Sequence, residues 1–115
     1  MSDIIKAEEM RATRTADGHI LYEFKKHLDL AWRRLGVMPE YTLPMFHATL
    51  KILVDEAPPD VHEMGFCIGS DSENWQFMIE MSLDRVSEFV MCMEKLAVNI
   101  QDEKPVVTLP KSNNN

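Results

Sequence analysis

Residues 65–100 have the sequence GFCIGSDSENWQFMIEMSLDRVSEFVMCMEKLAVNI, and this stretch decides most of the predicted fold. Its first half alternates apolar with polar side chains on either side of the polar run 70–74, which is typical of two strands joined by a turn. Its second half begins with Ser82 as a helix cap and then repeats apolar residues every three or four positions. The stretch therefore predicts a β-hairpin over about 65–81, followed by an amphipathic helix over about 83–100.

Two further amphipathic helices are predicted on the N-terminal side of this stretch. Apolar residues recur at steps of three and four positions over 19–35 and again over 43–57, which is the spacing of one helix face. Gly36 suits the end of the first helix, and Pro44 suits the first turn of the second. In an alternative interpretation, the start of the 19–35 segment continues a strand out of the turn at Asp17-Gly18.

Together these elements predict an α+β fold in which three amphipathic helices pack with a small antiparallel hairpin. The alternative is a mostly helical fold. A length of 115 residues fits one domain. We expect residues 1–18 to form a polar arm, because the alternation over 10–15 is only weakly hydrophobic, with a strand before the turn as the alternative. Residues 103–115 are expected to form a flexible tail.

The charge of the chain is acidic and unevenly distributed. The formal net charge is −7, and residues 55–115 contribute twelve acidic and four basic side chains, whereas residues 1–54 are nearly neutral. This acidity argues against general nucleic-acid binding, which depends on Lys and Arg contacting phosphates. No apolar run approaches the roughly 18 residues that span a bilayer, and the first residues lack a signal pattern. We therefore expect a cytoplasmic protein that contacts neither nucleic acid nor membrane.

Recognisable motifs for catalysis and for cofactor binding are missing from the sequence. There is no nucleophile elbow, no glycine-rich phosphate loop, and no pair of His or Cys residues at a zinc spacing. We expect no catalytic residue, no cofactor and no metal. The alternative is a small metal-dependent hydrolase that uses His47, His62 and Cys67, since imidazole and thiolate groups are good ligands for zinc.

A basic strip lies along the predicted 19–35 helix and consists of Lys25, Lys26, Arg33 and Arg34. We interpret it as a solvated helix face that nearby acids partly neutralise. The alternative is a nucleic-acid-binding module that uses this strip to contact phosphates.

Methionine is unusually frequent, with nine residues, and it concentrates with the acids in the predicted hairpin and last helix. Flexible thioethers adapt to a partner's surface, and an acidic field steers a basic partner. We predict a non-enzymatic protein-binding module that acts as an inhibitor or adaptor by masking a basic surface, of the kind that a virus, phage or other mobile element encodes. The residues expected to contact the partner are Asp71, Glu73, Met78, Glu80, Asp84, Glu88 and Met91.

An acidic dimeric chaperone is an alternative within the same class. The order of a hairpin and then an amphipathic helix with Asp84 in its first turn, over about 65–100, is broadly similar to secretion-chaperone folds. This similarity has no diagnostic motif that identifies a family. It implies that the chain forms a homodimer.

Overall fold

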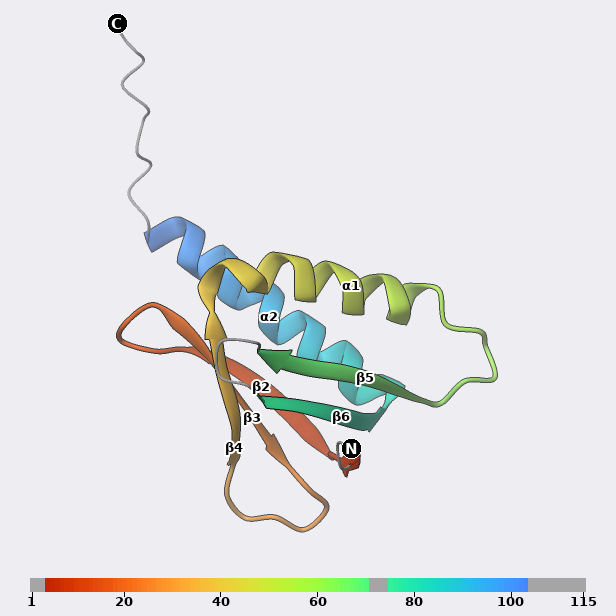
Figure 1. Ribbon diagram of the computed structural model, residues 1–115. Helices are drawn as coiled ribbons and strands as arrows, with labels where there is room; N and C mark the ends of the chain where they lie inside the picture. Colours follow the sequence, from red (N-terminus) through yellow and green to blue (C-terminus); the bar gives the residue numbers. More distant parts are fainter. Residues whose placement is uncertain (1–3, 71–74, 104–115) are drawn as a thin grey trace, which may run out of the picture.

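The computed structural model describes residues 4–70 and 75–103 of the chain. These residues form an α+β fold with two α-helices, so the predicted set of three helices is wrong. Along the chain the elements are β1 (Ile4–Lys6), β2 (Glu9–Arg14), β3 (His19–Lys25), β4 (Arg33–Pro39), the short 3-10 helix η1 (Glu40–Thr42), α1 (Leu43–Asp55), β5 (Glu63–Ser70), β6 (Trp75–Ser82) and α2 (Leu83–Glu103) (Figure 1).

The strands form two three-stranded sheets, and the chain passes between them twice, first from β1 to β2 and later from β4 through α1 to β5. One sheet has the order β1-β6-β5, with β1 parallel to β6, and the other is the antiparallel meander β2-β3-β4. The first of these passages, between β1 and β2, is short. There the Ala7 N–H donates to the Glu80 carbonyl at 2.9 Å, and the Glu8 N–H donates to the Lys25 carbonyl at 2.7 Å. Consecutive residues therefore bond to different sheets and fix the two sheets relative to each other.

The core lies where the two helices meet both sheets. α2 packs on the strands, and α1 lies beside α2 on the same side (Figure 1). Four rings from four elements meet there, and we call them the ring cluster: Tyr22, Phe46, Phe66 and Phe89. The Tyr22 ring centroid lies 5.6 Å from that of Phe46 and 6.2 Å from that of Phe89. The Phe66 centroid lies 6.1 Å from Phe46 and 6.5 Å from Phe89. Each such pair adds about 0.5–1.5 kcal/mol beyond simple burial.

The predicted helix over 19–35 is wrong, because this segment forms β3, a loop and the start of β4. In β3 the buried side chains alternate at Ile20, Tyr22 and Phe24, which is the period of a strand. Leu28, which belongs to the supposed helix face, is 84% exposed. β3 pairs with β2 on one side and with β4 on the other, so its backbone N–H and C=O groups form hydrogen bonds within the sheet. This pairing outweighs the helical spacing of the apolar residues over 19–35.

Residues 4–14 form β1 and β2, although the sequence favours a polar arm there. Met10 and Ala12 are 6% and 4% exposed, so the weak alternation of this segment still places its apolar side chains in the core. Gly18 makes the turn into β3 with a φ of 84°, a left-handed conformation that glycine adopts without strain. The alternative of a strand before this turn agrees with the structure.

The remaining elements lie close to the segments expected for them. The segment 43–57 contains α1, the segment 65–81 lies within the β5–β6 hairpin, and the segment 83–100 lies within α2. α2 continues to Glu103, and the rest of the expected tail over 103–115 lies outside the described residues.

The Tyr22 hydroxyl provides a test of the ring cluster. Tyr22 is fully buried, its hydroxyl has no hydrogen-bond partner among the described residues, and burial raises its pKa. An unpaired buried hydroxyl costs about 1–3 kcal/mol. We expect Tyr22→Phe to raise the free energy of unfolding by about 1 kcal/mol in urea denaturation, without a change in the m-value. Tyr41→Phe, on an 82% exposed ring, is the matched control and should change nothing. A less stable Tyr22→Phe variant would show that the hydroxyl is paired.

Candidate functional site

The structure divides the residues predicted to contact a partner between two surfaces. Met78 and Glu80 flank Ile79 in β6, and Ile79 is fully buried, so the two neighbours lie on the face of the β1-β6-β5 sheet that points away from the core. α2 packs on the opposite side. The other predicted members are Asp84, Glu88 and Met91, whose side chains are exposed on α2, and Asp71 and Glu73, which lie outside the described residues.

The acidic side of α2 is partly neutralised within the chain. Arg85 donates to the Glu88 carboxylate at 3.1 Å and lies 3.5 Å from the carboxylate of Glu9 in β2. These contacts raise the pKa of Arg85, with the hydrogen bond to Glu88 as the largest cause. The acids of this helix therefore form a weaker patch than the sequence alone indicates.

The three residues of the hydrolase alternative have separate surroundings. His47 on α1 is half-buried, with its Nε2 atom 3.6 Å from a carboxylate oxygen of Glu94 on α2. His62 is exposed before β5. Cys67 is exposed on β5, and its Sγ atom lies 3.9 Å from the Met78 sulfur. Within residues 4–70 and 75–103, no three His, Cys, Asp or Glu side chains converge so that they could hold a metal ion.

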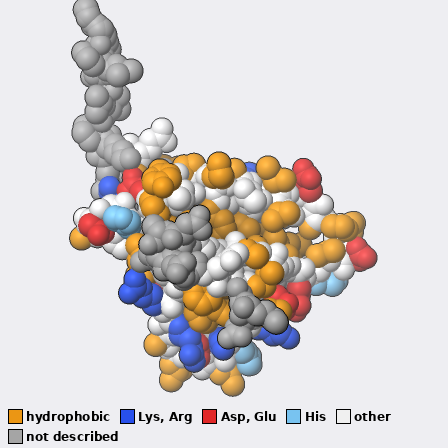
Figure 2. Space-filling view, viewed as in Figure 1, with side chains coloured by type: hydrophobic (Ala, Val, Ile, Leu, Met, Phe, Trp, Pro, Cys, Tyr) orange, Lys and Arg blue, Asp and Glu red, His pale blue; other side chains and the backbone are white. Residues whose placement is uncertain are grey.

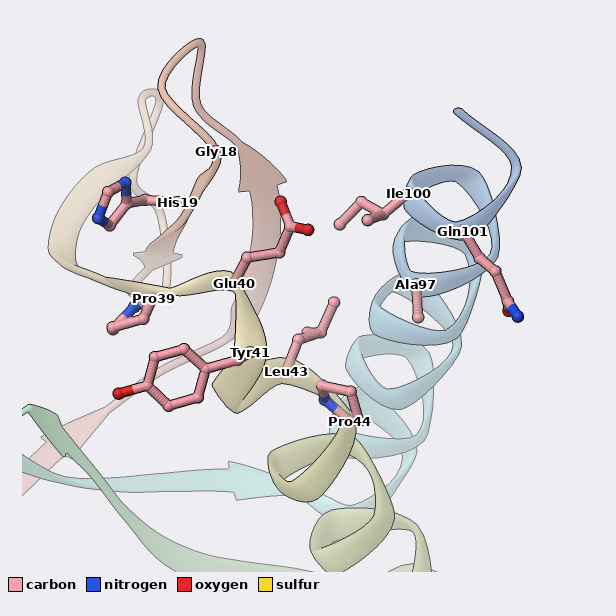
Figure 3. A pocket seen from close by; sticks show the side chains of 10 residues that line it. All are labelled: Gly18, His19, Pro39, Glu40, Tyr41, Leu43, Pro44, Ala97, Ile100 and Gln101. Carbon is pink, nitrogen blue, oxygen red and sulfur yellow. The ribbon is translucent and has the colours of Figure 1, made fainter. Parts of the chain in front are cut away.

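A groove of about 710 Å³ lies between the β2–β3 turn, the start of α1 and the end of α2 (Figure 3). Its volume is within the range of small-molecule sites, which usually combine apolar walls with a few polar groups that fix the ligand. The Leu43 and Ile100 side chains contribute to the apolar walls and are almost fully buried. The complete lining is Gly18, His19, Pro39, Glu40, Tyr41, Leu43, Pro44, Ala97, Ile100 and Gln101.

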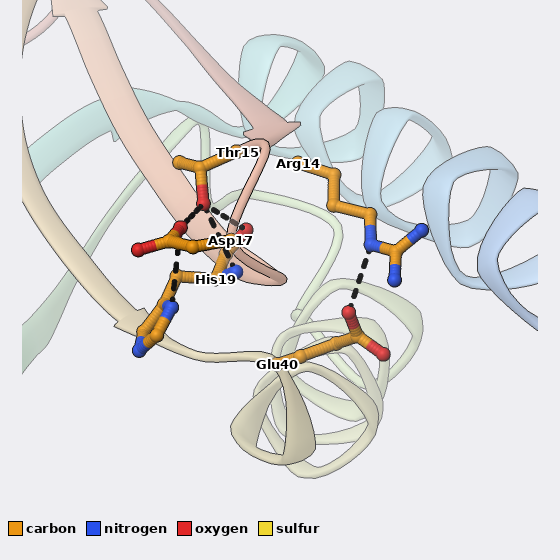
Figure 4. Close-up of polar contacts among 5 residues, drawn as sticks. All are labelled: Arg14, Thr15, Asp17, His19 and Glu40. Carbon is orange, nitrogen blue, oxygen red and sulfur yellow. Dashed lines mark hydrogen bonds and ion pairs between the residues drawn. The ribbon is translucent and has the colours of Figure 1, made fainter.

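The charged groups at the edge of this groove are engaged with one another (Figure 4). Arg14 donates from Nε to a Glu40 carboxylate oxygen at 2.9 Å. The Thr15 hydroxyl donates to Asp17 and holds the pKa of that carboxyl below its ordinary value, while His19 Nδ1 lies 3.4 Å from Asp17. These contacts stabilise the β2–β3 turn and the start of η1. The polar groups at the rim of the groove therefore have partners within the chain, and a ligand is not needed to explain them.

The β3–β4 loop, residues 26–32, presents two leucines to solvent. Leu28 is 84% exposed and Leu30 is 99% exposed. The loop projects below the sheets in Figure 1, and Figure 2 shows hydrophobic side chains at this lower tip with Lys and Arg side chains around it. A single exposed apolar residue needs no explanation, but two on one loop form an apolar tip that water covers only at a cost.

Asp29 forms hydrogen bonds that connect the two ends of this loop. Its carboxylate accepts hydrogen bonds from the Lys26 backbone N–H at 2.8 Å and from Arg33 Nε at 2.8 Å and Nη2 at 3.1 Å. The Asp29 N–H also donates to the Lys26 carbonyl at 3.0 Å. The Arg33 guanidinium and the Lys26 amide lower the pKa of Asp29 to about 2, so the carboxylate is ionised at neutral pH. Charge-assisted bonds of this kind are stronger than neutral ones.

The backbone of Leu28 is strained. It has a φ of 70°, and it is the one described residue other than glycine with a positive φ. The left-handed region costs an L-residue roughly 1–2 kcal/mol, and an exposed side chain offsets little of that cost. Such conformations persist where the surrounding structure enforces them, and they cluster at functional sites. Here the hydrogen bonds of the neighbouring Asp29 stabilise the loop around Leu28.

Basic side chains lie beside the loop and on the outer face of the β2-β3-β4 sheet. Trp32 is half-buried, with the Arg11 guanidinium 4.4 Å and the Lys25 ammonium 4.8 Å from the centre of a ring. Arg11 also pairs with Glu23 at 2.8 Å. Arg34 is exposed and has no ion-pair partner in the described part of the chain. The basic strip predicted along a helix is therefore gathered at the ends of two strands.

No protein-family model, no curated protein and no solved structure matches the chain. None of the helices within the described ranges is both long and apolar enough to cross a membrane. The β3–β4 loop is the strongest candidate for a functional site, because it combines exposed apolar side chains, a strained backbone and the hydrogen bonds of Asp29.

Removal of the Asp29 charge tests whether this residue orders the loop. We expect Asp29→Asn to speed hydrogen exchange of the Lys26 amide at neutral pH, because the Arg33 pair is lost. Asp55→Asn, which removes the carboxylate paired with Lys51 on α1, is the control and should leave that amide unchanged. Unchanged exchange in Asp29→Asn would contradict the bracing role.

The same carboxylate predicts a pH dependence. Because folding lowers the pKa of Asp29 to about 2, its contribution to stability is complete above its ordinary value near 4 and is lost as the pH falls through about 2. The NMR shift of the Lys26 amide should titrate with a midpoint near that value. A midpoint near 4 would show that the carboxylate has no strong partner.

Relief of the strain at Leu28 should stabilise the fold. Asn tolerates the left-handed region, so we expect Leu28→Asn to raise the free energy of unfolding by about 0.5–1 kcal/mol. Leu30→Asn, which replaces a more exposed leucine without a positive φ, should leave stability unchanged. Urea denaturation of both variants makes the comparison, and a destabilised Leu28→Asn would contradict the strain.

Proposed function

We propose that the chain is a non-enzymatic protein-binding module whose β3–β4 loop inserts Leu28 and Leu30 into an apolar cleft bordered by acidic residues on a partner protein. The observation that carries this proposal is the exposure of both leucines on a loop that Asp29 braces. The class of function is the one expected from the sequence. The surface proposed here is basic and apolar, and it differs from the acidic, methionine-containing surface that the sequence predicts on the hairpin and last helix.

The energetics of the loop favour binding over a structural role. Burial of a leucine contributes about 1.5–3 kcal/mol, and the fold forgoes this gain at two neighbouring positions. A loop that is already ordered loses little conformational entropy when a partner binds, so more of the burial appears as affinity. The strain at Leu28 fits this account, because a fold selected for stability alone would place glycine or asparagine there.

The charges beside the loop support an acidic partner. Lys25, Lys26 and Arg34 form no ion pair in residues 4–70 and 75–103, so their charges are available to steer a negative surface. Trp32 is less suited to stack on a nucleic-acid base, because Arg11 and Lys25 already lie over its rings. Insertion into a lipid bilayer would bury the ionised Asp29–Arg33 pair at the loop, which is costly.

Selection from a displayed library of random peptides tests the proposal. The immobilised full chain should enrich peptides in which Asp or Glu residues flank Leu, Ile or Phe. The Leu28→Ser/Leu30→Ser double variant should weaken binding of the enriched peptides at least about 10-fold, which corresponds to the loss of 1.4 kcal/mol. Arg34→Glu should weaken it further at low salt and reduce its salt dependence.

The matched control is Met91→Ser/Val98→Ser on α2, which removes two apolar side chains that are 59% and 51% exposed. This variant should bind as the unaltered chain does. If the control and not the loop variant loses binding, the partner surface lies on α2 and the proposal fails. Enrichment of peptides without acids, or salt-sensitive binding of a single-stranded oligonucleotide that Arg34→Glu abolishes, would also overturn it.

A further inference from the structure

The helix α1 is apolar on two opposite sides. Its inner side, with the stripe Leu43, Phe46, Leu50 and Val54, packs against the core. A second stripe runs along the opposite side at steps of four, three and four positions, beginning in η1, and we call it the outer stripe: Tyr41, Met45, Ala48 and Ile52. Three of its members are 82%, 77% and 55% exposed, in the order Tyr41, Met45, Ile52, and Ala48 is exposed as well. A surface helix normally carries polar residues there, whereas a helix that is apolar all round is a buried one.

The outer stripe itself contains no charged side chain. The ionisable residues of α1 are His47, Lys51 and Asp55. His47 lies toward Glu94 of α2, and Lys51 pairs with Asp55 at 3.1 Å along the edge of the stripe. The stripe is therefore uncharged along α1 on a chain whose formal net charge is −7, and the exposed Glu56 follows one turn after Ile52.

We infer that the outer stripe of α1 is the contact surface of a symmetric homodimer of this chain. A second copy carries the same net charge of −7, so two copies repel each other over most acidic surfaces and approach most easily where the charge is balanced. Figure 2 shows hydrophobic side chains along the upper edge of the molecule, over α1, and the Tyr41 ring in Figure 3 points away from α2. A two-fold contact matches an apolar stripe with itself.

The geometry suits an antiparallel pair of α1 helices. Ala48 lies near the middle of the stripe, and its small side chain lets the two helix axes approach closely. In this arrangement the start of one α1 faces the end of the other, so their helix dipoles attract. The 13-residue helix is about 20 Å long. A stable dimer needs about 800 Å² from each partner, so we expect the contact to include exposed residues beside the stripe such as Pro44.

This inference is independent of the loop proposed to bind a partner. α1 and the β3–β4 loop lie at opposite sides of the molecule (Figure 1), so a dimer through α1 leaves both loops accessible. Failure of one proposal therefore does not decide the other. The two are tested with different variants and different measurements.

Sedimentation equilibrium of the full chain tests the dimer. At micromolar concentrations we expect twice the 13.3 kDa mass of one chain. Met45→Glu and Ile52→Glu should each raise the dissociation constant about 30-fold or more, because each places an unpaired charge in the contact. Both side chains are exposed, and Glu in the first turn of a helix suits its dipole, so the Met45→Glu variant should keep its fold and its far-UV circular dichroism.

Met91→Glu on α2 is the matched control, since it places the same charge at another exposed methionine. It should remain dimeric. A monomeric unaltered chain at these concentrations overturns the inference. A dimer that survives Met45→Glu and Ile52→Glu, or one that Met91→Glu disrupts, overturns it as well.

Discussion

The contact among Tyr22, Phe46, Phe66 and Phe89 is the interaction on which the rest of the fold depends. These rings come from β3, α1, β5 and α2, so one cluster joins both sheets to both helices. A small sheet is not stable by itself and needs an apolar layer against one face. The hydrogen bonds of Ala7 and Glu8 link the two sheets where the chain passes from β1 to β2. The rings fill the space between them, and a buried ring at such a position is worth about 3–5 kcal/mol.

Among the described residues, this construction leaves the outer stripe of α1 and the β3–β4 loop as exposed apolar surfaces. The ring cluster takes up the inner stripe of α1, so the outer stripe, from Tyr41 to Ile52, has no cover within the described residues. β3 and β4 continue past the core and carry the loop with Leu28 and Leu30 away from it (Figure 1). The two surfaces lie at opposite sides of the molecule and differ in charge, since cations border the loop and the stripe is neutral. We interpret them as two separate contacts, one for a partner and one for a second copy.

The sequence predicts the elements whose periodicity agrees with their pairing, and it fails where two periods coexist. In α2 the apolar spacing is helical throughout, and 83–100 lies within the observed helix. In β3 the residues Ile20, Tyr22 and Phe24 alternate, but Leu21 and Leu28 also fit a helix face, and pairing with distant strands decides the outcome. Long-range pairing of this kind is not visible in a local window.

The same coexistence of strand and helix periods explains why the sequence does not predict the β3–β4 loop. Asp29 and Arg33 are four positions apart, which in a helix makes an ordinary surface pair. In the structure the same pair closes a loop, and Leu28 has a positive φ. A leucine in a sequence gives no signal that predicts this backbone conformation. The turn signal at Asp17-Gly18 and the weak alternation over 10–15 are the local features that indicate strands on either side of this turn. The outer stripe of α1 could have been found, because Tyr41, Met45, Ala48 and Ile52 recur at a helical spacing opposite the predicted core face.

We conclude that the β3–β4 loop is held rigid by Asp29 while Leu28 and Leu30 stay in solvent. Backbone ¹⁵N relaxation of the full chain tests it most directly. We expect order parameters near 0.85 for Leu28, Asp29 and Leu30, as in rigid backbone. Order parameters below about 0.6 at these residues, as in flexible loops, would contradict it.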